Sequence, residues 1–316
     1  WPYPKSDLFH WIPVLNRFDL LLESAVRTFG IGSGAPEKDK EKEKDAGEKR
    51  PGNVQSVPFD AETKEVLEAV LRFTRCLWEN CGNRNLYNSY EHLSDLLYTS
   101  DIDILEATLR LLLRPAQRLN PQRSLRVNFA LMQERLAILA QNWGTKEYGL
   151  ELPLLASSDP VDIPSELHAL AYQFYRSSGT GAGSAATASP APRTPARTPT
   201  SSSADGPIRI RVAVGIASPD VRRKLVIVRL LAIAIYVNVV TEDVAQTKLF
   251  LYEPDLCQKI ADLLQPERNI SFDIQTAAIY ALDCIAHYRG RLGEVLTALN
   301  ASANHGALMY TLRKII

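Results

Sequence analysis

Apolar residues recur at helical spacing along most of the chain, and residues 272–290 show the pattern most clearly. In this stretch apolar side chains fall at i, i+3, i+4, i+7, i+8 and i+11, which is the stripe of one helix face. They are Ile274, Ala277, Ala278, Ala281, Leu282 and Ile285. The opposite side is not polar, because it carries Ile279, Tyr280 and Cys284. We therefore expect neighbouring helices to cover this helix on two sides.

The same helical unit occurs at two other places. Matching apolar spacing is found in "DIDILEATLRLLL" (residues 101–113) and in "SPDVRRKLVIVRLLA" (residues 218–232). Recurrence of one helical unit is typical of a solenoid, in which each unit buries its two faces against the previous and the next unit. The pattern thus predicts an all-α fold built from stacked helices.

Helical periodicity extends over most of the sequence. We expect helices at residues 11–29, 61–79, 86–98, 102–114, 125–143, 165–176, 208–216, 219–239, 244–251, 253–264, 272–288, 291–299 and 303–316. The apolar face of the second of these is expected to consist of Val66, Ala69, Val70, Phe73 and Leu77. Asp60 is a suitable N-cap for it, and Gly82 a suitable stop. The stretch "IRIRVAVGI" at residue 208 also alternates like a short strand, but an isolated strand would lack a partner, so a helix is favoured.

Two segments interrupt the helical pattern. Residues 32–55 contain "APEKDKEKEKDAGEKR", where acidic and basic residues alternate and nothing can be buried, so a disordered or loosely helical insert is favoured over an interaction tract. Residues 177–207 consist mainly of Gly, Ser, Ala, Thr and Pro, which is linker composition. We expect one α-solenoid over residues 1–316 with two disordered inserts.

The charge of the chain points to no particular class of partner. It has 36 basic and 36 acidic residues, so net charge gives no reason to expect binding to nucleic acid or to an anionic membrane. A local basic cluster does exist, and it comprises Arg209, Arg211, Arg222, Arg223 and Lys224. No aromatic residues alternate with these charges, so direct binding of nucleic acid is disfavoured.

The longest apolar run covers residues 225–240, "LVIVRLLAIAIYVNVV". It is shorter than a bilayer requires, and Arg229 and Asn238 interrupt it. A helix buried among other helices explains this run better than a membrane span, so we expect no membrane association.

The four cysteines form no CxxC pair. Cys76, Cys257 and Cys284 lie in apolar helical patterns and are expected to be reduced core residues. Cys81, next to Gly82, is the one expected to reach the surface. Reduced thiols are typical of a protein of the cytoplasm and nucleus.

No recognised catalytic or cofactor-binding pattern is present. The five histidines occur singly, without a metal-ligand motif. The glycine-rich stretch "GTGAGS" at residue 179 follows a helix and not a strand, so it does not resemble a phosphate-binding loop. We therefore predict no catalytic, cofactor-binding or metal-binding residue.

Several stretches resemble a known family. "DIQTAAIYALDCIAH" resembles the third helix of an armadillo repeat. Five stretches, in the same order, are similar to the N-terminal armadillo-like region of the giant HECT-type E3 ubiquitin ligases, namely those with HECT, UBA and WWE domains in animals and their fungal counterparts. They are "LFHWIPVLNRFD", "LYNSYEHLSDLLYTSDIDILEATLRLL", "NWGTKEYGLEL", "RIRVAVGIASPDVRRKLVIVRLLAIAIYVN" and "NHGALMYTLRKI".

The resemblance implies a fold and a role. The fold would be an armadillo-like α-solenoid, and the chain would be an internal piece of a longer ubiquitin transferase whose catalytic HECT lobe lies elsewhere. The piece would belong to a ring-shaped scaffold that presents protein substrates to that lobe. Its partners would be those substrates and other parts of the ring.

An armadillo-type transport or interaction adaptor is the alternative function. Importin-type repeats clamp peptides with Trp and Asn side chains, whereas this chain has Tyr280 and Cys284 at the corresponding positions of its clearest repeat. The ligase scaffold is therefore favoured.

Overall fold

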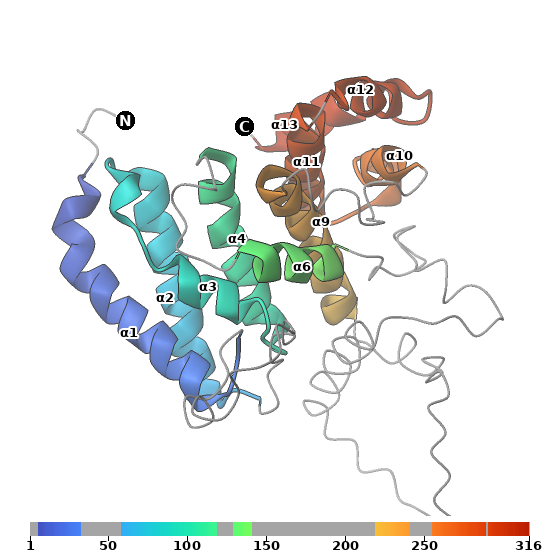
Figure 1. The fold of residues 1–316 in the computed structure, drawn as a ribbon. Coiled ribbons are helices and arrows are strands. Elements are labelled where there is room, and N and C mark those ends of the chain that lie inside the picture. Colours follow the sequence, from blue (N-terminus) through green and yellow to red (C-terminus); the bar gives the residue numbers. More distant parts are fainter. Residues whose placement is uncertain are drawn as a thin grey trace, which may run out of the picture.

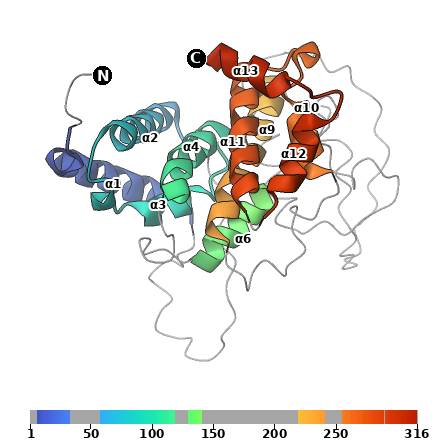
Figure 2. The ribbon, with the colours of Figure 1, turned by 90° about the horizontal axis from the view of Figure 1, so that it is seen from above.

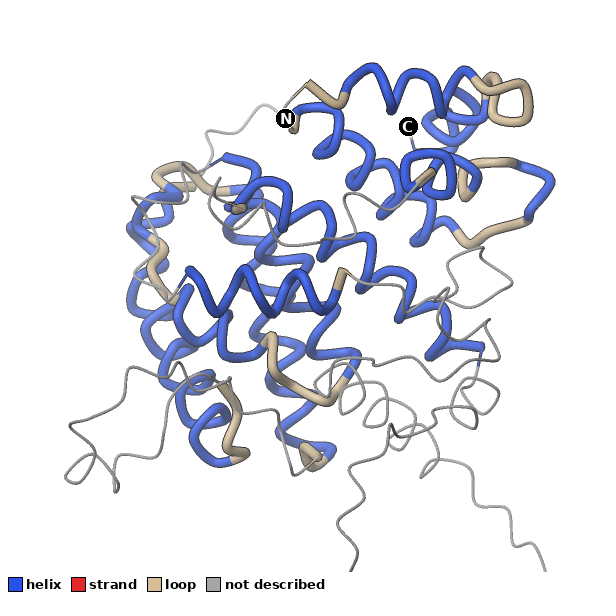
Figure 3. The backbone as a smooth tube through the Cα atoms, turned by 45° about the vertical axis from the view of Figure 1, so that its right-hand side comes forward, coloured by secondary structure: helices blue, strands red, loops and turns tan. Residues whose placement is uncertain are grey.

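The computed structural model describes residues 6–32, 58–118, 129–140, 219–240, 255–288 and 290–315. The α-helices in this part are α1 (Ile12–Thr28), α2 (Ala61–Asn80), α3 (Tyr90–Leu96), α4 (Ile102–Arg118), α6 (Phe129–Leu139), α9 (Pro219–Val239), α10 (Leu256–Asp262), α11 (Phe272–His287), α12 (Leu292–Asn300) and α13 (Ala307–Ile315). Short 3-10 helices lie at η1 (Leu8–Trp11), η3 (Arg84–Leu86) and η6 (Pro266–Arg268). Figure 3 shows no strand in the described part, which confirms the all-α class there.

The helices follow one another through space in nearly the order of the chain. Helix α1 packs on α2 and α3, α2 packs on α4, and α4 packs on α9. Helix α9 also contacts α6 and α11, and α11 in turn contacts α10 and α12. Figures 1 and 2 show this succession from the blue N-terminal side to the red C-terminal side. Each inner helix is therefore covered by neighbours on more than one side.

Helix α9 is the most enclosed element. From residue 225 to residue 236 no side chain is more than 2% exposed. A helix that is apolar all round needs cover on every side, and α4, α6 and α11 supply it. The prediction of a buried helix at residues 219–239 is confirmed, and none of the described helices is long and apolar enough to cross a membrane.

Helix α11 confirms the expected cover on two sides. Ala278 and Ile285 are fully buried, and Cys284 on the other side is 4% exposed. Ile279 and Tyr280 are half-buried and pack against the same core. The neighbours are α9, α10 and α12, so other helices cover α11 on more than one side.

Short polar side chains set where two of the helices begin. Asp60 caps α2 as predicted, because its carboxylate accepts hydrogen bonds from the Thr63 amide and hydroxyl, each at 2.8 Å. Asp101 does the same for α4, where it accepts from the amides of Asp103 at 2.9 Å and Ile104 at 3.2 Å. These caps fix the helices that carry most of the charged side chains discussed below.

The predicted face of α2 is wrong in part, although Val70 and Leu77 are buried as predicted. Val66 and Phe73 were expected to point into the core, but they are 43% and 41% exposed. The buried residues are Leu67, Val70, Leu71, Thr74, Leu77 and Trp78. Helix α2 carries two overlapping apolar stripes, and packing against α4 selects the second. Phe73 instead meets the ring of Trp11 edge-on, with centroids 5.8 Å apart.

The predicted helix at residues 86–98 is also wrong in its first part. The 3-10 helix η3 ends at Leu86, the backbone is extended at Tyr87, and α3 begins at Tyr90. Asn88 and Ser89 precede that start, and such side chains compete with helical backbone hydrogen bonds. The predicted helices at 165–176, 208–216 and 244–251, the glycine-rich stretch, and the inserts apart from Gly32 lie outside the described residues.

Candidate functional site

The four cysteines are placed differently from the prediction in two cases. Cys76 is exposed, and Cys81 is buried. Cys81 is covered because the N-terminal segment runs beside it, with the Gly82 amide donating to the Ser6 carbonyl at 2.8 Å and Leu8 donating back to Gly82 at 3.2 Å. Cys76 lies on the outer side of α2, since the other stripe faces the core.

The remaining thiols are in the core, as predicted. Cys257 and Cys284 are 5% and 4% exposed. Burial raises the pKa of the thiols of Cys81 and Cys257, which makes both poorer nucleophiles. The described residues contain no group of three or more His, Cys, Asp or Glu side chains able to hold a metal ion.

We expect the isolated chain to form no reducible ubiquitin adduct with a charged E2 enzyme. A thioester-forming cysteine must be accessible and must have its thiolate stabilised by a cation or a helix N-terminus. Cys76 is accessible, but it lies in the middle of α2 and contacts the Asn80 amide at 3.6 Å. Non-reducing electrophoresis checks the result. A reducible adduct that forms with the wild-type chain and not with the Cys76→Ser variant would contradict this expectation.

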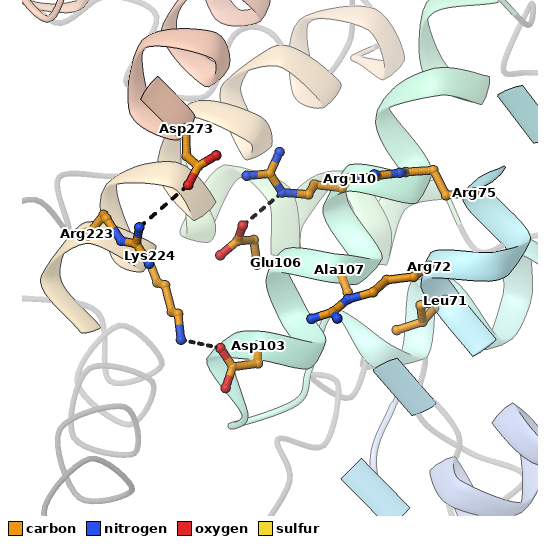
Figure 4. Close-up of a pocket in the computed structure, with 10 residues that line it drawn as sticks. All are labelled: Leu71, Arg72, Arg75, Asp103, Glu106, Ala107, Arg110, Arg223, Lys224 and Asp273. Carbon is orange, nitrogen blue, oxygen red and sulfur yellow. Dashed lines mark hydrogen bonds and ion pairs between the residues drawn. The ribbon is translucent and has the colours of Figure 1, made fainter. Parts of the chain in front are cut away.

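A cavity of about 400 Å³ lies among α2, α4, α9 and α11, and it is the candidate site (Figure 4). Its lining is strongly charged, with Leu71 and Ala107 as apolar surface. The charged side chains are Arg72, Arg75, Arg110, Arg223, Lys224, Asp103, Glu106 and Asp273. A pocket with this lining suits a polar, charged ligand better than an apolar one.

Helical periodicity places these residues around the cavity. On α4, Asp103, Glu106, Ala107 and Arg110 follow one another at i, i+3, i+4 and i+7, which is one face of the helix. Helix α2 contributes a second face, with Arg72 and Arg75 three residues apart. Figure 4 shows these two faces opposite the N-terminal ends of α9 and α11, which carry the other charged residues.

Asp103 lies at the centre of an ionic network that joins three helices. Its carboxylate accepts from Lys64 Nζ of α2 and from Lys224 Nζ of α9, each at 2.6 Å. Burial acts to raise the pKa of Asp103, but the hydrogen bonds from Lys224 and Lys64 outweigh burial and lower that pKa. The two lysines are also paired elsewhere, with Asp101 at 2.9 Å and Asp220 at 2.7 Å.

Further pairs connect the same helices at the edges of the cavity. Arg223 reaches Asp220 at 2.7 Å and Asp273 of α11 at 3.5 Å. The residues of the predicted basic cluster that the structure describes, Arg223 and Lys224, are therefore paired with carboxylates. Arg209, Arg211 and the side chain of Arg222 lie outside the described set.

Asp103→Asn is expected to lower the free energy of unfolding by about 1 to 3 kcal/mol at neutral pH, because Lys64 and Lys224 lose their shared negative partner. The pKa of Asp103 is lower in the folded state. Its stabilisation is therefore complete above the unfolded pKa and is lost as the pH falls through the folded value. Wild type and variant should begin to converge below about pH 4 in urea titrations. An offset that does not shrink on acidification would contradict this.

The sequence did not predict the cavity, although one signal for it was present. The charged residues at i, i+3 and i+7 of α4, beside an alanine, mark a polar stripe on a helix that is otherwise apolar. The complementary residues lie far away in the chain, at Arg72 and at Asp273. Helical spacing alone does not reveal which stripes will face each other.

Comparison with known proteins shows that the chain is similar to a segment of large E3 ubiquitin-protein ligases. The E3 ubiquitin-protein ligase ptr1 of Schizosaccharomyces pombe is 26% identical over 341 residues, which cover 99% of this chain and 10% of the relative. The E3 ubiquitin-protein ligase UPL1 of Arabidopsis thaliana is 28% identical over 337 residues, which cover 100% of this chain and 9% of the relative. The E3 ubiquitin-protein ligase HUWE1 of Mus musculus is 32% identical over 181 residues, which cover 57% of this chain and 4% of the relative.

The chain spans a tenth or less of the length of these relatives. Their names confirm the resemblance to giant E3 ubiquitin ligases that the sequence motifs indicate. Residues 62–208 and 205–316 match the family described as Domain of Unknown Function (DUF908). Because these two matches together extend over more than half of the chain, the chain belongs to the DUF908 family.

Proposed function

We propose that this chain is a non-catalytic scaffold segment of a HECT-type E3 ubiquitin ligase and that it recruits protein substrates. The observation that carries the proposal is the similarity to E3 ubiquitin-protein ligases of a fungus and a plant over 99% and 100% of this chain. In this proposal the transferase activity belongs to the longer protein of which this chain is a segment. That protein acts in the cytoplasm and nucleus.

The packing of the helices supports a scaffold. Helices α2, α4, α9 and α11 succeed one another, and each contacts the next. An armadillo-like α-solenoid has this succession, and it offers extended surfaces on which partners bind. We therefore assign the armadillo-like solenoid to the chain as part of the proposal.

The transport-adaptor alternative receives no support from α11. The hydroxyl of Tyr280 accepts from Arg114 at 2.8 Å, and the same guanidinium lies over the ring at 5.0 Å. Cys284, at the position of the peptide-clamping amide, is buried. Neither position is available to clamp a peptide in the importin manner.

A competition assay tests the scaffold function. An excess of this chain, added to the ligase that contains it, should reduce ubiquitination of a protein substrate. Loading of ubiquitin onto the catalytic cysteine of the ligase should not change, because the chain competes for substrate and not for the E2 enzyme. A destabilised variant such as Leu231→Ala, heated before use, serves as the control. Unchanged substrate ubiquitination at all concentrations of the chain would contradict the proposal.

A further inference from the structure

The charged cavity is more positive than negative. Five cationic and three carboxylate side chains line it, which leaves two positive charges in excess at its wall. Carboxylates just outside the wall, such as Glu68 and Asp220, partner some of these cations. What matters for a ligand is therefore which cations are firmly held and which can turn toward it.

The cations of α9 are firmly held. Lys224 Nζ contacts Asp103 at 2.6 Å and Asp220 at 2.7 Å, and its side chain is 22% exposed. Burial acts to lower its pKa, but the hydrogen bonds that Lys224 donates to the two carboxylates raise that pKa overall. Arg223 is shared between two carboxylates. These two residues therefore connect α9 to α4 and α11.

Three arginines of α2 and α4, namely Arg72, Arg75 and Arg110, are held less firmly. The nearest carboxylate oxygen to Arg75, on Glu79, lies 3.9 Å from its Nε, beyond hydrogen-bond distance. Arg110 donates through Nε to Glu106 at 2.8 Å, and its terminal amino groups have no partner among the described residues. Arg72 pairs with Glu68 at 2.6 Å, but its side chain is 70% exposed, and exposed pairs of this kind contribute little free energy.

These three arginines line the same cavity. Arg72 and Arg75 reach from α2 toward α4, and Arg110 reaches from α4 along the cavity toward Asp273 (Figure 4). Guanidinium groups bind phosphate through two parallel hydrogen bonds, a geometry that lysine does not offer. Several arginines around one hollow are the arrangement that recognises a phosphorylated side chain.

We propose that this cavity binds a phosphate monoester on a serine or threonine of a protein partner. A phosphate monoester carries nearly two negative charges at neutral pH, and the guanidinium groups of Arg75 and Arg110 have N–H donors that can bind it. Leu71 and Ala107 provide apolar surface for the carbon atoms of the modified side chain. That the partner is a protein rests on the proposed function, whereas the phosphate chemistry rests on the cavity.

The carboxylates in the wall argue against a nucleic acid in the same place. Asp103, Glu106 and Asp273 face the cavity, and they would repel a chain of successive phosphates. A single dianion can be held by the arginines without approaching all three. The proposal therefore concerns one phosphate group on a protein segment.

The test uses the full 316-residue chain and a degenerate peptide library with one fixed phosphoserine. Immobilised chain should retain the library, and phosphatase treatment of the library should abolish the retention. The double variant Arg72→Gln/Arg75→Gln should weaken binding about tenfold or more, as expected for the loss of charge-assisted hydrogen bonds. Inorganic phosphate at millimolar concentration should compete.

A matched control is available in the same chain. Arg27 is 76% exposed and pairs with Glu23 at 2.7 Å, as Arg72 pairs with Glu68. Arg268 has a side-chain exposure of 37%, the same as Arg75, and a carboxylate partner at 3.4 Å. Arg27→Gln/Arg268→Gln therefore removes the same charge outside the cavity, and it should leave phosphopeptide binding unchanged. Thermal unfolding followed by circular dichroism verifies that both variants are folded.

Several outcomes would overturn the proposal. They are equal retention of phosphorylated and phosphatase-treated libraries, equal losses in the two double variants, and tighter binding of an RNA oligonucleotide that depends on the same arginines. The competition assay separates this proposal from the scaffold function. If the wild-type chain competes for substrate but retains no phosphopeptide, the cavity proposal fails and the scaffold remains.

Discussion

Leu231→Ala and Ile233→Ala should each lower the free energy of unfolding by about 2 to 5 kcal/mol. The two residues lie two positions apart on α9, so they point to nearly opposite sides of the helix. They are 1% and 0% exposed, respectively. Each substitution removes buried methyl groups and leaves a cavity, because α4, α6 and α11 enclose the helix. Urea unfolding followed by circular dichroism measures the loss.

The control for this pair is an exposed apolar residue. Met309 is 59% exposed, and Met309→Ala should change the free energy of unfolding by no more than about 0.5 kcal/mol. If either Leu231→Ala or Ile233→Ala has the stability of the wild type, then that side of α9 is not packed. The enclosure of α9 by α4, α6 and α11 would then be wrong.

Leu282→Ala on α11 should also lower the free energy of unfolding by about 2 to 5 kcal/mol. Leu282 is 3% exposed and belongs to the main core. Ile279, three residues before Leu282 and at the edge of the buried stripe, is half-buried against that core. Ile279→Asp should therefore lower the free energy of unfolding by about 1 to 3 kcal/mol, because it desolvates a polar group that has no partner.

Hydrogen exchange provides a second measurement for α11. In an array of helices in which each contacts its neighbours, damage should spread mainly to adjacent elements. Amides of α9 and α12 should exchange faster in Leu282→Ala, whereas those of α1 and α2 should keep their protection. If Ile279→Asp unfolds like the wild type, that side of α11 faces solvent, and Ile279 and Tyr280 become part of an apolar binding surface.

The sequence predicts the helices well where apolar residues are abundant. Helix α9 begins and ends at the predicted residues, and α11 ends one residue early, because long apolar runs and clear caps leave few alternatives. The prediction fails on α2, where two apolar stripes overlap and the packing partner decides between them. The exchanged positions of Cys76 and Cys81 follow from that choice and from the N-terminal segment that covers Cys81.

The candidate site is less predictable than the fold, for a physical reason. Each helix contributes a few charged residues, and in isolation each set resembles an ordinary solvated face. Asp103 acquires its role through Lys64 and Lys224, which lie on other helices. Such a network depends on which helix faces meet, and helical spacing within one segment contains no information about that.

The enclosure of α9 has a consequence for synthesis of the protein. This helix leaves the ribosome after α4 and α6, which can cover part of it, but before α11. Its remaining side stays apolar and uncovered until translation reaches His287, which at ribosomal speeds takes about 2 to 10 seconds. During that interval the nascent chain displays a strongly hydrophobic helix. We expect general chaperones that bind apolar segments to contact the nascent chain at residues 225–236, and ribosome profiling of chaperone-bound nascent chains would detect this contact.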